Sequence, residues 1–192
     1  IGTSSPSYKL DVVGNSSVAR LQSTGASQNA QLNIQSTVGT WSIGQNITQA
    51  STGTLEFYNS SLRMALDSSG NLGLGVTPSA WATLRGLQNG RANLVGYASN
   101  AEGAWLTSNA FYDGSGWKYQ VSSQATMYQQ LSGVQSWLTA SSGTAGSAIT
   151  FSTAMTLSAA GALSTPLADA TIHGITVGLG GSSISSNTAL GN

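Results

Sequence analysis

Apolar and polar residues alternate over short stretches along most of this chain, and Gly, Asn, Asp or Ser closes each stretch. Trp117, Tyr119 and Val121, for example, alternate with Lys118 and Gln120. A period of two residues is that of a strand with one buried face, whereas a helix repeats every 3.6 residues. Helical spacing never persists for three turns in this sequence. The pattern therefore predicts an all-β protein made of short strands.

Turn sequences separate the predicted strands. Gly and Asx residues supply the positive φ angles and the side-chain hydrogen bonds that tight turns need. They cluster at residues 67–71, 89–90, 113–116 and 143–146. Frequent turns between strands of a few residues favour a hairpin-rich architecture.

A repeated phrase divides the chain. Residues 64–72 recur in modified form at 155–163, and residues 74–79 echo residues 1–7. Repetition at this scale is typical of tandem arrays. The predicted array has five parts, and its first residues are expected to continue from a longer polypeptide. The parts are a junction from a preceding module (1–14), a first β module (15–77), a connector (78–85), an aromatic-rich second β module (86–163) and a Gly-rich β repeat tail (164–192).

Charge is scarce in this composition. The 192 residues carry six Lys or Arg and six Asp or Glu, which is 6 % where a soluble domain carries roughly 25 %. A net charge of zero gives no electrostatic footprint for nucleic acid, and no apolar run approaches the roughly 20 residues of a membrane span. The absence of Cys excludes disulfides and thiolate metal sites. Neither nucleic-acid binding nor membrane insertion is expected.

Small β modules need support beyond their own cores. A chain of such size buries only about 60 % of its unfolded surface, and without disulfides the remaining routes are packing against neighbouring modules and oligomerisation. Gly and Pro junctions suit an elongated assembly in which strand edges pair instead of facing water. Uncharged Ser, Thr, Asn and Gln can meet their own copies at an axis without repulsion. We expect an elongated, fibrous homotrimer.

Several phrases together resemble a known family. Residues 1–12 and 64–75 are Gly- and Ser-rich phrases, and residues 155–163 look like a further copy. Phe111-Tyr112-Asp113-Gly114 with Trp117-Lys118-Tyr119 follows between them, and residues 168–178 with 187–191 complete the series. In this order they resemble the shaft repeats of tailed-phage tail fibres. Such fibres often end in an intramolecular chaperone domain related to that of endosialidases, which this sequence does not contain.

The resemblance implies a structural virion component, located in the tail fibre, that serves host attachment without being an enzyme. The implied partners are its own copies, other tail or baseplate proteins, and a host-surface glycan or receptor. No cofactor is expected. Two alternatives stay open at this point, namely a bacterial trimeric surface adhesin and a tailspike-like glycan depolymerase.

Residues suited to acid–base or metal chemistry are few. Glycoside hydrolysis usually needs two facing carboxylates. The six carboxylates are expected to be solvated or to sit in turns, namely Asp11, Glu56, Asp67, Glu102, Asp113 and Asp169. The single His173 has no local triad, and a metal shared by three copies of it is the weaker alternative because paired His would make a stronger site. No catalytic residue and no metal site are predicted.

Aromatic residues gather in the second predicted module. Their rings can stack on the apolar faces of sugars, and amides such as Gln120, Gln124, Gln129 and Gln130 can bond hydroxyl groups. Packing within or between chains is the expected use of any one ring, with Tyr112 and Tyr128 the least constrained. The candidate glycan-binding residues are Trp105, Tyr112, Trp117, Tyr119, Tyr128 and Trp137.

Overall fold

The fold is all-β, as the alternation of apolar and polar residues predicts. The computed structural model describes residues 20–24, 29–49, 53–99 and 101–165, and these contain no helix. Among them, accordingly, no helix has the length and apolar character needed to cross a membrane. The strands are β1 (Ala30–Ser36), β2 (Gly39–Gln45), β3 (Leu55–Asn59), β4 (Ser61–Leu66), β5 (Leu72–Leu74), β6 (Leu84–Asn89), β7 (Ala92–Tyr97), β8 (Ala104–Ser108), β9 (Ala110–Tyr112), β10 (Trp117–Tyr119), β11 (Ser123–Leu131), β12 (Val134–Gly143), β13 (Ser152–Leu157) and β14 (Leu163–Ser164).

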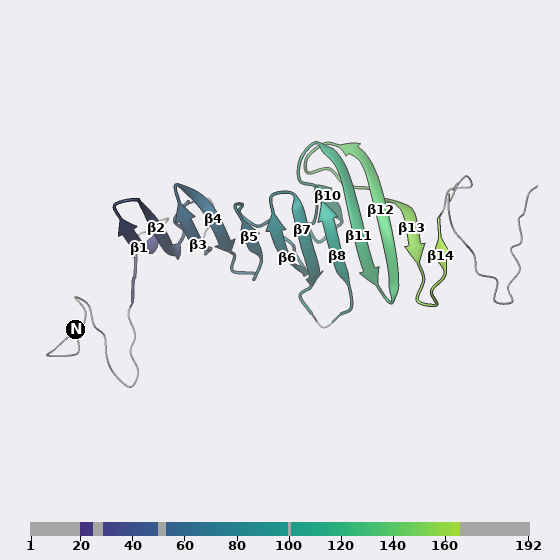
Figure 1. The fold of residues 1–192 in the computed structure, drawn as a ribbon, viewed down its shortest axis with the longest axis horizontal. Helices are drawn as coiled ribbons and strands as arrows, with labels where there is room; N and C mark the ends of the chain where they lie inside the picture. Colours follow the sequence, from purple (N-terminus) through teal and green to yellow (C-terminus); the bar gives the residue numbers. More distant parts are fainter. Residues whose placement is uncertain (1–19, 25–28, 50–52, 100, 166–192) are drawn as a thin grey trace, which may run out of the picture.

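Twelve of these strands form one long sheet in chain order, from β1 to β8 and then β11 to β14. Every neighbouring pair in it is antiparallel except β5 and β6, which are parallel. The strands lie across the long axis of the molecule and follow one another along it (Figure 1). Because ladder hydrogen bonds run perpendicular to antiparallel strands, most of them point along this axis.

The repeated phrase forms the same turn twice. In the first copy Asp67 N–H donates to the Asn71 carbonyl and Gly70 N–H to the Asp67 carbonyl, at 2.9 and 3.0 Å. In the second copy Ser158 N–H donates to the Ala162 carbonyl, and Gly161 N–H to the Ser158 carbonyl, both at 2.9 Å. The two phrases are thus equivalent in backbone hydrogen bonding. The division of the chain into modules stays a prediction.

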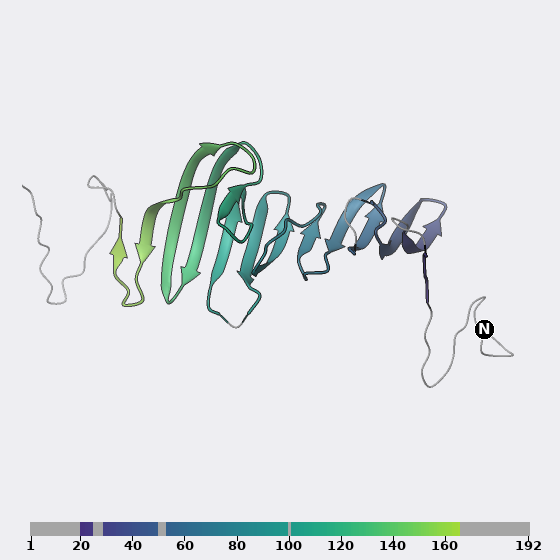
Figure 2. The ribbon, with the colours of Figure 1, turned by 180° about the vertical axis from the view of Figure 1, so that it is seen from behind.

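One face of the sheet is covered. The β9–β10 hairpin lies across it in the middle of the molecule (Figure 2). The segment after β12 binds that hairpin, since Ile149 N–H donates to the Trp117 carbonyl at 2.8 Å. The core lies between these layers and centres on Trp81, Leu84, Val95, Trp105 and Met127, with Phe111, Tyr112, Trp117, Leu131, Leu138 and Phe151 packed around it.

Trp81 lies at the centre of this core, and 0 % of its surface is exposed. It belongs to the segment that crosses between the parallel strands β5 and β6, within the range expected to be a connector. Gly86 is required beneath it, because a Cβ at that position would lie 2.7 Å from the Trp81 indole nitrogen. The crossover therefore contributes the largest fully buried side chain among the described residues.

Candidate functional site

The opposite face of the sheet carries a continuous line of apolar side chains. One residue from each of nine successive strands lies directly opposite its neighbour on the next strand. We call this line the apolar row. Its members are Leu55, Leu66, Leu72, Leu87, Leu94, Leu106, Tyr128, Trp137 and Met155.

Five of the nine residues of the apolar row are exposed, the other four are partly buried, and none is charged. Leu94 and Leu106, at its middle, are 56 % and 55 % exposed although they lie in regular strands. Eight strand spacings of about 4.8 Å make the row about 38 Å long. A shorter flanking row lies beside it and extends the apolar surface to β1. Its members are Leu32, Ile43, Phe57, Met64 and Leu74.

On the covered face Glu56 is buried, which corrects the expectation of a solvated or turn carboxylate. The side chain is 1 % exposed. Thr48 donates to it twice, through its backbone N–H at 2.7 Å and its hydroxyl at 2.9 Å, and the Thr54 hydroxyl donates at 2.8 Å. Three donors from either side of one loop offset the loss of water around the carboxylate. Glu56 therefore holds Thr48 and Thr54 beside β3.

Asp67 and Asp113 are turn residues, as predicted. Asp67 accepts hydrogen bonds from the backbone N–H groups of Ser69 and Asn71 at 2.9 and 2.8 Å. The pKa of Asp113 lies below its ordinary value, mainly because its carboxylate accepts a hydrogen bond from the Ser115 hydroxyl. Hydrogen bonds from the backbone N–H groups of Ser115 and Gly116 and the positive charge of Lys118 lower the pKa further. Both carboxylates are occupied in organising their own turns.

Of the remaining titratable candidates, the structure describes Glu102. Glu102 lies in the loop before β8, and Asp11, Asp169 and His173 fall outside the described residues. Within the part of the chain that the structure describes, no three His, Cys, Asp or Glu side chains come together to hold a metal ion.

Three of the six candidate aromatic residues meet in one pocket. Trp105, Tyr112 and Trp117 line it together with Tyr97, which was not among the predicted residues. Ring centroids are 5.1 Å apart for Tyr97 and Trp105, 6.2 Å for Trp105 and Trp117, and 5.7 Å for Tyr112 and Trp117. We call this the aromatic pocket. It has a volume of about 240 Å³, and its other lining residues are Thr83, Leu84, Gln129 and Leu131.

The other three candidates lie elsewhere. Tyr128 and Trp137 belong to the apolar row on the opposite face, with ring centroids 5.0 Å apart. Tyr119 is buried in a second small core, where its hydroxyl donates to the Ser141 carbonyl. The six predicted residues are thus divided among two faces and a core, and they do not form one site.

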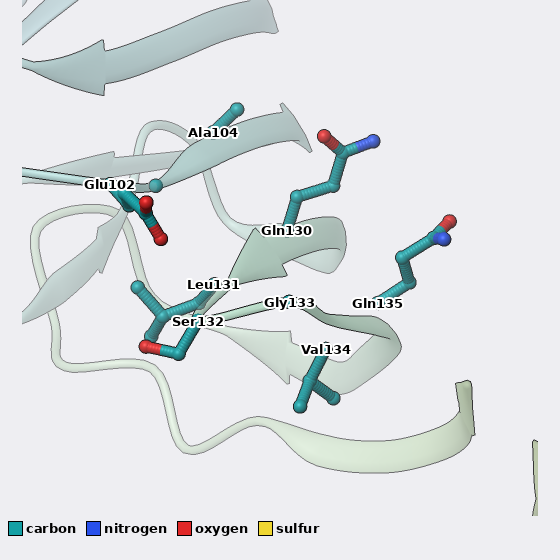
Figure 3. Close-up of a pocket in the computed structure, with 9 residues that line it drawn as sticks. Glu102, Ala104, Gln130, Leu131, Ser132, Gly133, Val134 and Gln135 are labelled. Atoms are coloured by element: carbon teal, nitrogen blue, oxygen red, sulfur yellow. The ribbon is translucent and has the colours of Figure 1, made fainter. Parts of the chain in front are cut away.

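A second cleft adjoins the aromatic pocket, and Leu131 lines both. The cleft has a volume of about 450 Å³ and lies between the loop that carries Glu102 and the turn that joins β11 to β12 (Figure 3). Gln130 and Gln135 also line the cleft. The Tyr128 hydroxyl connects their two amides, because it accepts a hydrogen bond from Gln130 Nε2 at 2.9 Å and donates one to Gln135 Oε1. These amides are thereby held in place.

Comparison with protein-family models and with curated proteins gives no match to this chain. The features that bear on function are therefore the two faces of the sheet. One presents a long uncharged apolar row, the other presents the aromatic pocket, and the cleft lies beside the β11–β12 turn.

Proposed function

We propose that this chain is a segment of the shaft of a tailed-phage tail fibre, a parallel homotrimer that serves host attachment. The observation that carries the proposal is the apolar row. Leucines at the middle of regular strands, more than half exposed, are expected to be covered by a partner. The phrases that resemble tail-fibre shafts indicate that the partner is a second and third copy of the same chain.

The chemistry of the row suits identical copies. Side chains that lie on a rotational axis meet their own symmetry mates, so each level of the row would pack leucine against leucine or aromatic against aromatic. None of its nine residues is charged, so bringing copies together buries no ionic group. Burial of apolar surface contributes about 25 cal/mol per Å². The covered faces, with their aromatic pockets, would then point outward.

The function of such a shaft is geometric. A long sheet with strands across its axis sets a fixed distance between the two ends of the segment (Figure 1). Other tail or baseplate proteins would adjoin it along the fibre. Three identical outward faces would give avidity to individually weak contacts with the host surface.

The test is the number of chains in solution. Size-exclusion chromatography with light scattering of the 192-residue chain should give the mass of three copies. The double variant Leu94→Asp, Leu106→Asp places charges at the centre of the row and should yield single chains. Val38→Asp is the matched control, because Val38 is 95 % exposed in the turn after β1 and outside the row. It should leave the trimer intact.

Two results would contradict the proposal. One is a wild-type chain that is monomeric or dimeric at micromolar concentration. The other is an assembly that survives the double variant unchanged. Release of new reducing ends from a bacterial surface polysaccharide by the intact assembly would instead favour the depolymerase alternative.

A further inference from the structure

We infer that the aromatic pocket binds an uncharged pyranose unit of a host-surface glycan. This inference depends on the proposed function, because the fibre assembly is what would leave this face free while covering the apolar row. Its support is the composition and arrangement of the pocket itself.

Aromatic rings make up half of the lining residues of the pocket. Tyr97 meets Trp105 at an interplanar angle of 77°, and Tyr112 meets Trp117 at 67°. An edge-to-face contact covers one face of one ring and leaves the faces of the other ring uncovered by that pair. Trp105 itself belongs to the core and is 6 % exposed, so Tyr97, Tyr112 and Trp117 supply the accessible ring surface. The apolar C–H face of a pyranose is a chemical complement to such surfaces, since aromatic faces carry partial negative charge.

Two polar side chains complete the pocket. Gln129 and Thr83 line it, and neither side chain has a hydrogen-bond partner among the described residues. The amide offers both donors and an acceptor, and the hydroxyl offers one donor and two acceptor lone pairs. Sugar hydroxyl groups need both kinds of partner. The pocket thus combines ring faces with unpaired groups that can bond hydroxyls.

The volume of the pocket and its lack of charged residues limit the class of ligand that it can bind. Its volume of about 240 Å³ equals the space of about eight water molecules, which suits one sugar ring and excludes a folded protein segment. None of its eight lining residues is charged. A sialic acid or uronic acid would therefore lose water around its carboxylate without gaining a cation. A neutral hexose is the expected class.

Close packing fixes two of the rings that line the pocket. A Cβ on Gly103 would lie 2.6 Å from the Trp105 ring and 2.8 Å from the Tyr97 ring. Only glycine allows these two rings their observed positions. Tyr97 is 37 % exposed, so it is available to a ligand from outside.

The experiment is a binding titration of the full chain. Tryptophan fluorescence would be followed while methyl β-galactoside, methyl α-glucoside and N-acetylglucosamine are added, and a printed array of neutral and acidic bacterial polysaccharides would be probed in parallel. We expect binding to neutral glycans. Tyr97→Ala and Tyr112→Ala should each weaken it about tenfold. Gln129→Met, which keeps the length of the side chain but removes its hydrogen bonds, should do the same.

Tyr58→Ala is the matched control, because Tyr58 lies in β3, opposite Ser42 and away from the pocket. It should bind as the wild type does. Binding that is unchanged in all three pocket variants, binding to acidic glycans alone, or no binding to any probe would overturn the inference. Light scattering on the same samples separates the two claims: a trimer without glycan binding refutes only this inference, whereas a monomer refutes the proposed shaft.

Discussion

At the scale of single residues, uncharged polar side chains connect separate elements through hydrogen bonds. Asn71 is buried, and its amide donates to Asp67 Oδ2 at 2.8 Å while its oxygen accepts from Gly86 N–H at 3.1 Å. It therefore ties the turn after β4 to β6, next to the parallel pairing of β5 and β6. In the second copy of the repeat the matching residue is Ala162, which cannot make these bonds.

Replacing Asn71 tests this tie. Asn71→Ala leaves the buried Gly86 N–H without its partner and should lower the free energy of unfolding by about 2 kcal/mol. Urea denaturation followed by tryptophan fluorescence would measure it. The control Asn59→Ala, in β3, should change the free energy of unfolding by less than about 0.5 kcal/mol. Equal effects of the two substitutions would refute the proposed role of Asn71.

Asp113 should make the β9–β10 turn sensitive to acid. Its pKa is below the ordinary value of 3.8, so the ionised form stabilises the turn above that value, and the stabilisation is lost as the pH falls through the lowered pKa. Amide exchange at Ser115 and Gly116 should accelerate in that range. Asp113→Asn should remove the pH dependence, and persistence of it in this variant would contradict the assignment.

The sequence predicts residues such as Asp67 and Asp113 well, because their partners lie within four positions along the chain. Glu56 shows where such reasoning fails. Its donors come from Thr48 and Thr54, and these hydrogen bonds make a buried carboxylate tolerable. No local pattern distinguishes Glu56 from a carboxylate on an exposed strand face.

At the scale of elements, strands were predictable and their covering layer was not. Alternation locates β4 and β10, and the turn sequences locate the ends of their hairpins. Trp81 lies near Pro78 in a segment with no periodicity, which the sequence predicts to be a connector. Its core partners Val95, Trp105 and Met127 are distant in sequence, and only the pairing order of the sheet brings them together.

Removal of the Trp81 ring should be the most damaging single change in this core. Trp81→Ala should lower the free energy of unfolding by about 3 to 5 kcal/mol, since it leaves a large cavity between the sheet and the β9–β10 hairpin. Trp81→Phe keeps a ring and should cost less. Urea denaturation would compare the two variants, and an unfolding midpoint of Trp81→Ala equal to that of the wild type would contradict this account of the core.

At the scale of the whole molecule, the apolar row emerges from register. Alternation shows which positions of a strand are apolar, but a slip of one residue between neighbours would break the row. The parallel pairing of Leu72 with Leu87 continues it across the crossover, and no turn sequence announces that pairing. Composition predicts partner chains, but it does not show which surface would meet them.

A parallel assembly in register brings each row residue close to its own copies. The chain has no Cys, so Leu94→Cys introduces a single thiol. A short bis-maleimide should link two copies of this variant, seen as a doubled mass on denaturing gels. Val38→Cys should stay unlinked. Linking of Val38→Cys but not of Leu94→Cys would place the contact on another surface.

The direction of the strands has a mechanical consequence. Because the strands lie across the long axis, a force that pulls the ends of the segment apart would break the hydrogen bonds between one pair of strands after another (Figure 1). A single sheet pulled in this way opens from an end, such as the two-residue strand β14, rather than shearing all its rungs at once. The resistance of a shaft to stretching would therefore come from the packing of its copies against one another along the row of leucines.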